Sequence, residues 1–185
     1  MKPLIVIPAR MASTRLPNKP LADIHGQPMI VHVMQRAAEA GQGPVIVACA
    51  EEIILDAIIS SGGQAILTDP DLPYGTDRVR AAADIFDPEG DYDVVVNVQG
   101  DMPALDPSLI AAVMDVLKTH PECDIATAVV TTNNPREIKD PNVVKAVLAE
   151  NGRALYFSRS AIPNGEGPIY HHVGLYAYRR KALRA

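Results

Sequence analysis

Short apolar runs and helix-patterned segments alternate through the first 118 residues of this 185-residue chain. Each run has the composition of a strand buried on both faces, and each is followed by a segment whose apolar residues recur at helical spacing. Strands are predicted at 4–7, 45–49, 65–67 and 94–98, and helices at 29–39, 53–60, 77–86 and 107–118. This alternation predicts a three-layer α/β fold with a mainly parallel sheet covered by helices.

The pattern changes after Asp124. The segments IATAVVTT, VVKAVLAE and RALYFSRS have strand composition, and Asn151-Gly152 between the last two is a hairpin signal. We therefore expect an antiparallel C-terminal part. The length suits one domain with a sizeable core, so we predict a single domain over 1–185.

Composition excludes several classes of partner. The net charge is −5, and the basic residues are scattered except in one loop, which argues against nucleic acid and membrane surfaces. The start MKPLIVIPAR lacks the layout of a signal peptide and no stretch suits a membrane span, so we expect a cytoplasmic protein. Cys49 and Cys123 lie far apart without partners at metal-ligand spacing, and we interpret them as structural thiols.

The loop after the first strand concentrates positive charge. Arg10, Arg15 and Lys19 follow the run at 4–7, which Pro8 is expected to end. Ligands of open α/β sheets bind at the carboxyl ends of the strands. Guanidinium groups bind phosphate oxygens in pairs, whereas an ammonium group acts as a point charge. The loop therefore predicts a triphosphate site.

The alternative is a solvated basic loop, and the neighbouring residues favour phosphate binding. Ala9, Ala12 and Ser13 are small enough to let a ligand approach the backbone, and Pro17 and Pro20 stiffen the loop.

A second apolar strand, at 94–98, also ends in polar groups. Mg²⁺ is held by one or two carboxylates together with phosphate oxygens and water, so Asp101 is a candidate metal ligand. Gln99 offers an acceptor and two donors that suit a base or a sugar hydroxyl. The alternative role for Asp101, capping the next helix, is better filled by Asp106 before Pro107.

The segment YGTDRVRAAADIF begins a helix that Thr76 or Asp77 is expected to cap. Arg78 lies in its first turn, where the helix dipole disfavours a cation, so an anionic partner is expected. Asp77 and a substrate carboxylate are equally good candidates for that partner.

Strict alternation in YHHVGLYAYR places His172 and Tyr176 on one side of a strand. They either contact one ligand or are ordinary half-buried residues of a sheet. The pattern leaves both interpretations open.

Taken together, these segments resemble the 3-deoxy-manno-octulosonate (Kdo) cytidylyltransferases, also called CMP-Kdo synthetases. The resemblance rests on motifs in family order across nearly the whole chain: IPARMASTRLPNKPL, GQPMIVHV, GTDR, NVQGD, DPNVVK with ALYFSR, and HHVGLYAYR. It implies a fold of the nucleotide-diphospho-sugar transferase type. It also implies an Mg²⁺-dependent homodimer that condenses CTP with Kdo to CMP-Kdo and pyrophosphate for lipopolysaccharide biosynthesis.

The resemblance also implies roles for residues. Arg10, Lys19 and Asp101 would be catalytic, with Asp101 as the metal ligand. The nucleotide-binding set would be Ala9, Arg10, Ser13, Arg15, Lys19 and Thr76, and the sugar-binding set Arg78, Gln99, His172 and Tyr176. Arg78 would then pair with the carboxylate of the sugar acid.

Two other functions stay open. Relatives continue past RRKALRA with a region that supplies a second metal-binding Asp, and we expect the domain at 1–185 to lack this region. A nucleotide-binding protein without turnover is therefore one alternative. A CMP-sialate-type synthetase, which differs only in the sugar, is the other.

Overall fold

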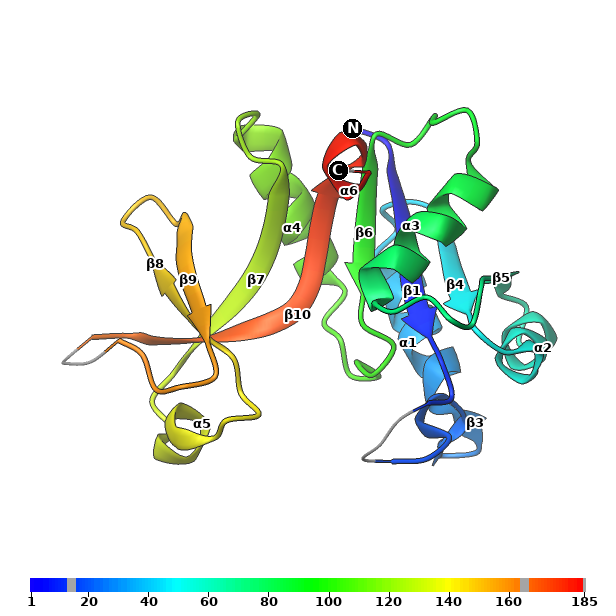
Figure 1. The fold of residues 1–185 in the computed structure, drawn as a ribbon, viewed down its shortest axis with the longest axis horizontal. Coiled ribbons are helices and arrows are strands. Elements are labelled where there is room, and N and C mark those ends of the chain that lie inside the picture. Colours follow the sequence, from blue (N-terminus) through cyan, green and yellow to red (C-terminus); the bar gives the residue numbers. More distant parts are fainter. Residues whose placement is uncertain (13–15, 164–166, 185) are drawn as a thin grey trace. The chain divides into compact units, whose positions relative to one another are not determined.

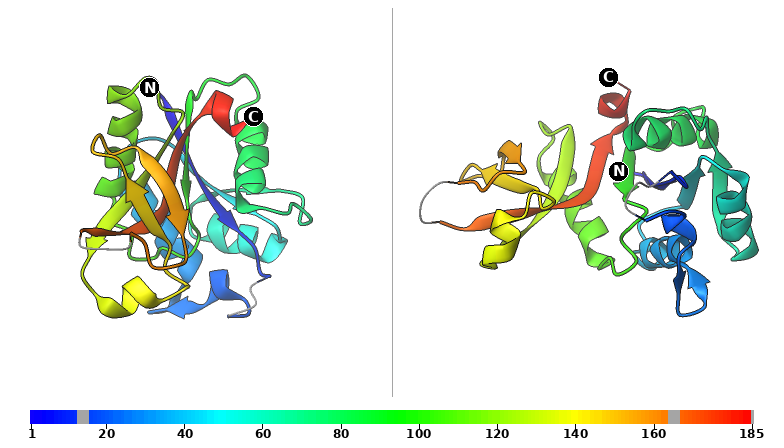
Figure 2. Two further views of the ribbon diagram at one scale, coloured as in Figure 1. Left: turned by 60° about the vertical axis from the view of Figure 1, so that its left-hand side comes forward. Right: turned by 60° about the horizontal axis from the view of Figure 1, so that its bottom comes forward.

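The computed structural model describes residues 1–12, 16–163 and 167–184 (Figures 1 and 2). The chain forms two compact units, which we describe separately. Unit 1 comprises Met1–Ala126 and Leu175–Ala185, and unit 2 comprises Thr127–Gly174.

Unit 1 is built on a mainly parallel sheet with the strand order β5-β4-β1-β6-β10. The neighbours from β5 to β6 are parallel, and β10 lies antiparallel to β6. The strands are β1 (Pro3–Ala9), β4 (Val45–Cys49), β5 (Gln64–Leu67), β6 (Val94–Val98) and the 175–179 part of β10 (Ile169–Arg179). The predicted parallel sheet is confirmed.

Helices cover both faces of this sheet, with α3 on one face and α1 on the other (Figure 2, right). The long helices are α1 (Met29–Glu39), α2 (Glu52–Ser60), α3 (Gly75–Phe86) and α4 (Ser108–Thr119). The short elements are the 3₁₀ helix η1 (Lys19–Leu21), the strands β2 (Asp23–Ile24) and β3 (Gln27–Pro28), and helix α6 (Arg180–Leu183). The predicted helices agree with α1 to α4 within two residues.

The core explains why the strands of unit 1 are continuously apolar. Leu4 and Val6 of β1 belong to one core cluster with Val79 and Ala82 of α3. The whole run from Leu4 to Ile7 is fully buried, so both faces of β1 are covered.

The prediction that Pro8 ends the first strand is wrong. β1 runs on to Ala9, with Pro8 opposite Ala48 and Ala9 opposite Cys49. The amide of Ile5 donates to Pro44 next to β4, so amides at odd-numbered positions of β1 face β4. The missing donor of Pro8 therefore faces β6, where the ladder has already ended at Val6.

The predicted cap of α3 is also wrong. The helix begins at Gly75, and Tyr74 before it makes no side-chain cap. Thr76 and Asp77 therefore lie inside the first turn, two and three residues after the N-cap position, which is too late to cap the helix.

α4 begins at Ser108, one residue later than predicted, with Pro107 at the N-cap position and Asp106 directly before it. The carboxylate of Asp106 accepts hydrogen bonds from the amide of Ser108 at 3.0 Å and from its hydroxyl at 2.8 Å. Asp106 thus satisfies a free amide of the helix and leaves Asp101 for another role.

Unit 2 is antiparallel, as predicted. Its elements are β7 (Ile125–Thr132, which begins in unit 1), α5 (Pro135–Lys139), β8 (Lys145–Leu148), β9 (Ala154–Ser158) and the first part of β10. β8 pairs antiparallel with β9 and with β10. Gly152 lies in the β8–β9 turn with φ 81°, the left-handed region that glycine tolerates.

A buried lysine organises unit 2. Lys145 is fully buried, and its Nζ donates to the carbonyl oxygens of Asp140, Val143 and Arg159 at 2.6–2.9 Å. These three bonds use all donors of the ammonium group and join the turn before β8 to the end of β9.

A membrane-crossing helix is not found: across the described ranges, every helix is too short or too polar to span a bilayer.

Candidate active site

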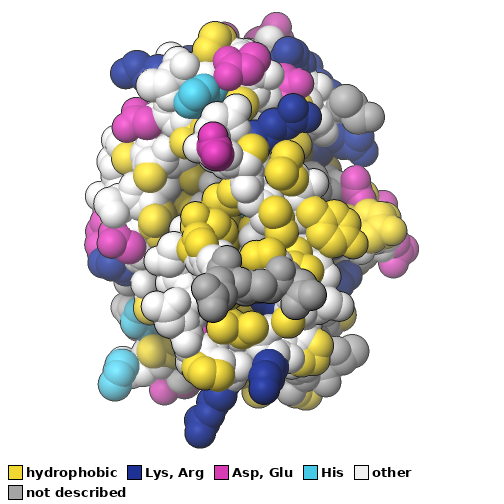
Figure 3. All heavy atoms as spheres, turned by 90° about the vertical axis from the view of Figure 1, so that its left-hand side faces the viewer, with side chains coloured by type: hydrophobic (Ala, Val, Ile, Leu, Met, Phe, Trp, Pro, Cys, Tyr) yellow, Lys and Arg dark blue, Asp and Glu magenta, His cyan; other side chains and the backbone are white. Residues whose placement is uncertain are grey.

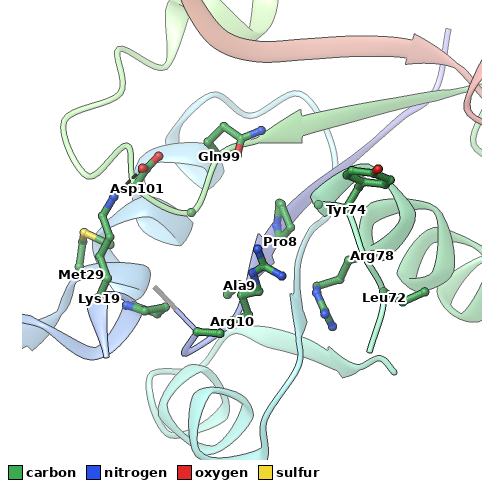
Figure 4. A pocket seen from close by; sticks show the side chains of 14 residues that line it. Pro8, Ala9, Arg10, Lys19, Met29, Leu72, Tyr74, Arg78, Gln99 and Asp101 are labelled. Atoms are coloured by element: carbon green, nitrogen blue, oxygen red, sulfur yellow. Dashed lines mark hydrogen bonds and ion pairs between the residues drawn. The ribbon is translucent and has the colours of Figure 1, made fainter. Parts of the chain in front are cut away.

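A pocket of about 390 Å³ lies in unit 1, at the carboxyl ends of β1 and β6. Its lining comes from the loop after β1, from η1, from the start of α3 and from the loop after β6. The polar and charged side chains that line it belong to Arg10, Lys19, Tyr74, Arg78, Gln99 and Asp101. Lys19 and Asp101 lie on one side, Tyr74 and Arg78 on the other, and Arg10 lies between them (Figure 4).

A close backbone contact brings the two strand ends together. A Cβ atom at Gly100 would lie 2.6 Å from the carbonyl oxygen of Pro8 and 3.3 Å from Ile30. Only glycine therefore lets the loop after β6 pass directly over the end of β1. This approach places Asp101 beside the cationic loop.

Lys19 and Asp101 form an ion pair across the pocket wall. The Lys19 Nζ lies 2.6 Å from Asp101 Oδ2, although the two residues are 82 positions apart. Both side chains are partly exposed, at 31% and 47%. Both charged groups therefore stay accessible to a ligand.

Arg78 supplies a buried positive charge beneath the pocket. Its side chain is 2% exposed, and its guanidinium donates to the hydroxyl of Thr68 and to the carbonyl oxygens of Asp69 and Pro70. Burial lowers the pKa of Arg78, because the low-dielectric surroundings disfavour its charge. These bonds go to neutral oxygens rather than to Asp77, the neighbour considered above.

Comparison with known proteins decides the family. A family model described as "Cytidylyltransferase" matches residues 4–184. The 3-deoxy-manno-octulosonate cytidylyltransferase of Paramagnetospirillum magneticum is 56% identical over 188 residues, covering 99% of this chain and 76% of the relative. That of Rhodospirillum rubrum is 58% identical, covering 99% and 75%. This chain belongs to the 3-deoxy-manno-octulosonate cytidylyltransferase family.

Comparison with solved structures supports the same family and fold. A CMP:2-keto-3-deoxy-manno-octonic acid synthetase complexed with CTP matches with a TM-score of 0.91 and 38% identity, over 100% of this chain and 76% of that one. A cytidylyltransferase from Leptospira borgpetersenii matches with a TM-score of 0.62 and 19% identity, over 100% and 63%, and supports the fold alone. The resemblance drawn from the motifs is confirmed.

The structure gathers many of the residues that the family resemblance singled out. Ala9, Arg10, Lys19, Arg78, Gln99 and Asp101 all line the pocket. Thr76 is exposed one residue beyond the pocket-lining Gly75, and its side chain hydrogen-bonds Tyr178. Ser13 and Arg15 lie outside the described residues. The binding roles of all these residues stay predictions.

The two residues predicted from the last strand fall in different units. Tyr176 lies in unit 1, opposite Asn97 of β6, and packs against the core. His172 lies in unit 2, where its Nε2 is 2.9 Å from the hydroxyl of Thr127 and its ring meets Phe157 edge-on. Burial lowers the pKa of His172, so its neutral form is favoured.

Sequence reasoning missed Tyr74 as part of the pocket. Its ring lines the pocket and is 72% exposed, which leaves an aromatic face open to a ligand. Its position directly before the GTDR motif, after a proline-rich turn, was the available signal.

The pocket offers limited protein ligands for a metal. The described residues contain no group of three or more His, Cys, Asp or Glu side chains arranged around a common point. Asp101 supplies a carboxylate in the pocket wall. This donor set fits Mg²⁺, which takes one or two carboxylates and completes its shell with phosphate oxygens and water.

Cys49 has no nucleophilic role. It is fully buried in β4, and burial raises the pKa of its thiol to about 12. The thiol therefore stays protonated and inert near neutral pH, in agreement with a structural role.

Proposed function

We propose that this chain is a nucleotidyltransferase that condenses CTP with Kdo to give CMP-Kdo and pyrophosphate. The observation that carries the proposal is the pocket that joins Arg10, Lys19, Arg78 and Asp101 at the carboxyl ends of two parallel strands. Its relatives at 56% and 58% identity bear the corresponding name.

The reaction that suits this pocket is an in-line displacement at the α-phosphorus of CTP. The anomeric oxygen of the sugar forms the new bond to phosphorus as its hydroxyl proton passes to solvent, and pyrophosphate leaves with the electrons of the broken bond. Arg10 and Lys19 would hold the triphosphate and stabilise the charge that develops on the leaving group. The sugar acid is also anionic, so the cations must offset its repulsion by the triphosphate before reaction.

Asp101 would hold Mg²⁺ together with phosphate oxygens. When bound, the metal neutralises charge on the phosphoryl group and on the departing pyrophosphate. Lys19 would then exchange Asp101 for the triphosphate, because a metal ion and an ammonium group compete for the same carboxylate oxygen.

In unit 1, Arg78, Gln99 and Tyr176 would contact the sugar acid, and a sugar-binding role of His172 in unit 2 stays a prediction. Arg78 is the proposed partner of the sugar acid's carboxylate, because Arg78 lines the pocket and its guanidinium donates to neutral oxygens of Thr68, Asp69 and Pro70. We further propose that the product serves lipopolysaccharide biosynthesis and that the reaction takes place in the cytoplasm, where CTP is made.

We also propose that the active form is a homodimer. β9 ends the pairing order β10-β8-β9, and its apolar side chains Leu155, Tyr156 and Phe157 are 59%, 63% and 42% exposed. Figure 3 shows apolar side chains gathered on one face of the molecule. An apolar edge strand of this kind is usually covered by a partner.

The proposal is tested by measuring pyrophosphate release from CTP in the presence of Mg²⁺ and each of a panel of sugar acids. We expect release that depends on Kdo. Release with sialate instead would support a CMP-sialate synthetase, and CTP binding without release for any sugar would support a nucleotide-binding protein without turnover.

A further inference from the structure

The loop that carries Arg10 is held by a side chain that lies outside the pocket lining. The backbone amide of Met11 donates to both carboxylate oxygens of Glu51, at 3.1 and 3.0 Å. Met11 and Glu51 lie 40 positions apart, so this contact joins the loop after β1 to the start of α2.

Glu51 takes the place of the next rung of the parallel ladder. The last backbone bond between the two segments runs from the amide of Ala50 to the carbonyl of Ala9, at 3.1 Å. If the ladder continued, the amide of Met11 would next meet the carbonyl of Ala50. The Glu51 carboxylate accepts that amide instead, so the backbone can leave the sheet without an orphaned donor.

The side chain of Glu51 has no second structural task at its own helix. Glu51 is the N-cap residue of α2, but its side chain makes no cap hydrogen bond. Ser, Thr, Asp and Asn are the residues that cap helices well. The placement of a longer glutamate at this position is therefore explained by its reach to Met11.

The charge of Glu51 acts in two opposite ways near the pocket. Glu51 is the carboxylate that most opposes the effect of burial on the pKa of Arg78, while Arg10 acts with burial to lower this pKa. The same charge repels a triphosphate, so the two effects offset each other in CTP binding and the hydrogen bond to Met11 is the contribution that remains.

We propose that Glu51 is a positioning residue of the triphosphate site. Its carboxylate fixes the Met11 amide, and this contact holds the adjacent Arg10 toward the pocket before the nucleotide arrives. The inference rests on the proposed function, because it assigns the held loop to triphosphate binding.

A pair of variants of similar length separates the hydrogen bond from the charge. Glu51→Gln and Glu51→Met both remove the charge, but only Gln keeps an oxygen that accepts the Met11 amide. Glu52→Met is the matched control, because Glu52 is an exposed acidic neighbour in the first turn of α2. Thermal unfolding of each variant shows whether it is folded.

Three measurements are made on each protein. Hydrogen exchange of the Met11 amide, followed by NMR, reports the contact without any ligand. Titration calorimetry with CTP and steady-state kinetics report the site, and a positioning role predicts a change in KM for CTP with little change in kcat.

We expect the Met11 amide to be protected in the wild-type chain and in Glu51→Gln, and to lose protection in Glu51→Met. CTP affinity should fall about tenfold in Glu51→Met, as expected for loss of a hydrogen bond to a charged group, and stay within about twofold of wild type in Glu51→Gln and Glu52→Met.

Equal CTP affinities of the Gln and Met variants would overturn the inference, and so would a Met11 amide that exchanges freely in the wild-type chain. A weakening of the same size in Glu52→Met would overturn it too, because the effect would then belong to α2 in general. If the wild-type chain bound no CTP, the proposed function would fail, and the exchange measurement would still decide whether Glu51 holds Met11.

Discussion

The ammonium group of Lys19 has two partners, Asp101 in the structure and the triphosphate in the proposed reaction. Its Nζ lies 2.6 Å from Asp101 Oδ2 in the structure. Because both side chains are partly exposed, the pair is weakly held and readily exchanged. The ion pair is therefore suited to a site that must accept an anion and a metal ion together.

Lys19→Met is expected to weaken CTP binding about tenfold without Mg²⁺, because the triphosphate loses a charge-assisted contact and meets an unpaired carboxylate at Asp101. Added Mg²⁺ should restore part of this loss, since the metal neutralises the same carboxylate. Calorimetry with and without Mg²⁺ measures both effects. Lys118→Met, an exposed lysine in the last turn of α4, is the control. An unchanged CTP affinity in Lys19→Met would contradict the role given to Lys19.

At the scale of elements, α6 is held to α3 by one buried guanidinium. Arg180 is 7% exposed and donates to the carboxylate of Asp87 at 2.7 Å and to that of Asp84 at 3.0 Å. Burial acts to raise the pKa of Asp87, but hydrogen bonds from the amides of Tyr92 and Asp91 and the charge of Arg180 outweigh it, so the pKa is lowered overall. The short helix α6 depends on this cluster as well as on its buried Leu183.

Arg180→Met should lower the free energy of unfolding by about 3–5 kcal/mol at pH 7, because it leaves Asp87 charged, buried and without its ion-pair partner. A carboxyl group with a lowered folded-state pKa stabilises the protein above its unfolded value of about 3.9, and this contribution is lost as pH falls through the folded-state pKa. The difference between wild type and variant should therefore shrink toward pH 3.

Urea unfolding at pH 7 and at low pH measures this change. Arg184→Met is a matched control, since Arg184 also contacts Asp84 but its side chain is 49% exposed and should contribute little. A difference that stays constant with pH would show that packing, and not the ion pair, determines the effect of the Arg180 substitution.

Elements with a strong apolar period were predictable from sequence, and contacts with backbone groups far away in the chain were not. The predicted bounds of α1, β4 and β6 coincide with the observed ones, because burial on one helix face or on both strand faces fixes the residue types. The rule that ligands bind at strand ends also brought Arg10, Lys19, Gln99 and Asp101 to one pocket.

The contact of Glu51 with the Met11 amide leaves no such signature. The Glu51 carboxylate accepts a hydrogen bond from a backbone amide, which every residue except proline carries. The residue type at position 11 therefore does not predict the contact. The predicted end of β1 at Pro8 was wrong for a related reason. The sequence does not tell which neighbouring strand each amide of β1 faces, and only the observed register does.

At the scale of the whole molecule, β9 is an apolar edge strand that the described part of the chain leaves exposed. Ala154 to Phe157 are all exposed, so both faces of this edge strand meet solvent even though three of the four side chains are large and apolar. A second copy of the chain that covers β9 would remove the exposed apolar area and the free strand edge together, which is the physical basis of the proposed homodimer.

Tyr156→Lys should convert the proposed dimer to a monomer, because it would place a charge in the centre of the proposed interface, while the residue is 63% exposed in the single chain. Ile85→Lys is the matched control: Ile85 is 59% exposed on α3 of unit 1, and its replacement should leave the dimer intact. Sedimentation equilibrium over a range of concentrations measures the mass of each protein, and circular dichroism checks the fold.

Two results would contradict the assignment: a wild-type chain that stays monomeric at all concentrations, or a Tyr156→Lys variant that dimerises as strongly as wild type. In the second case the partner must bind elsewhere, and the apolar side chains of β9 would need a different occupant.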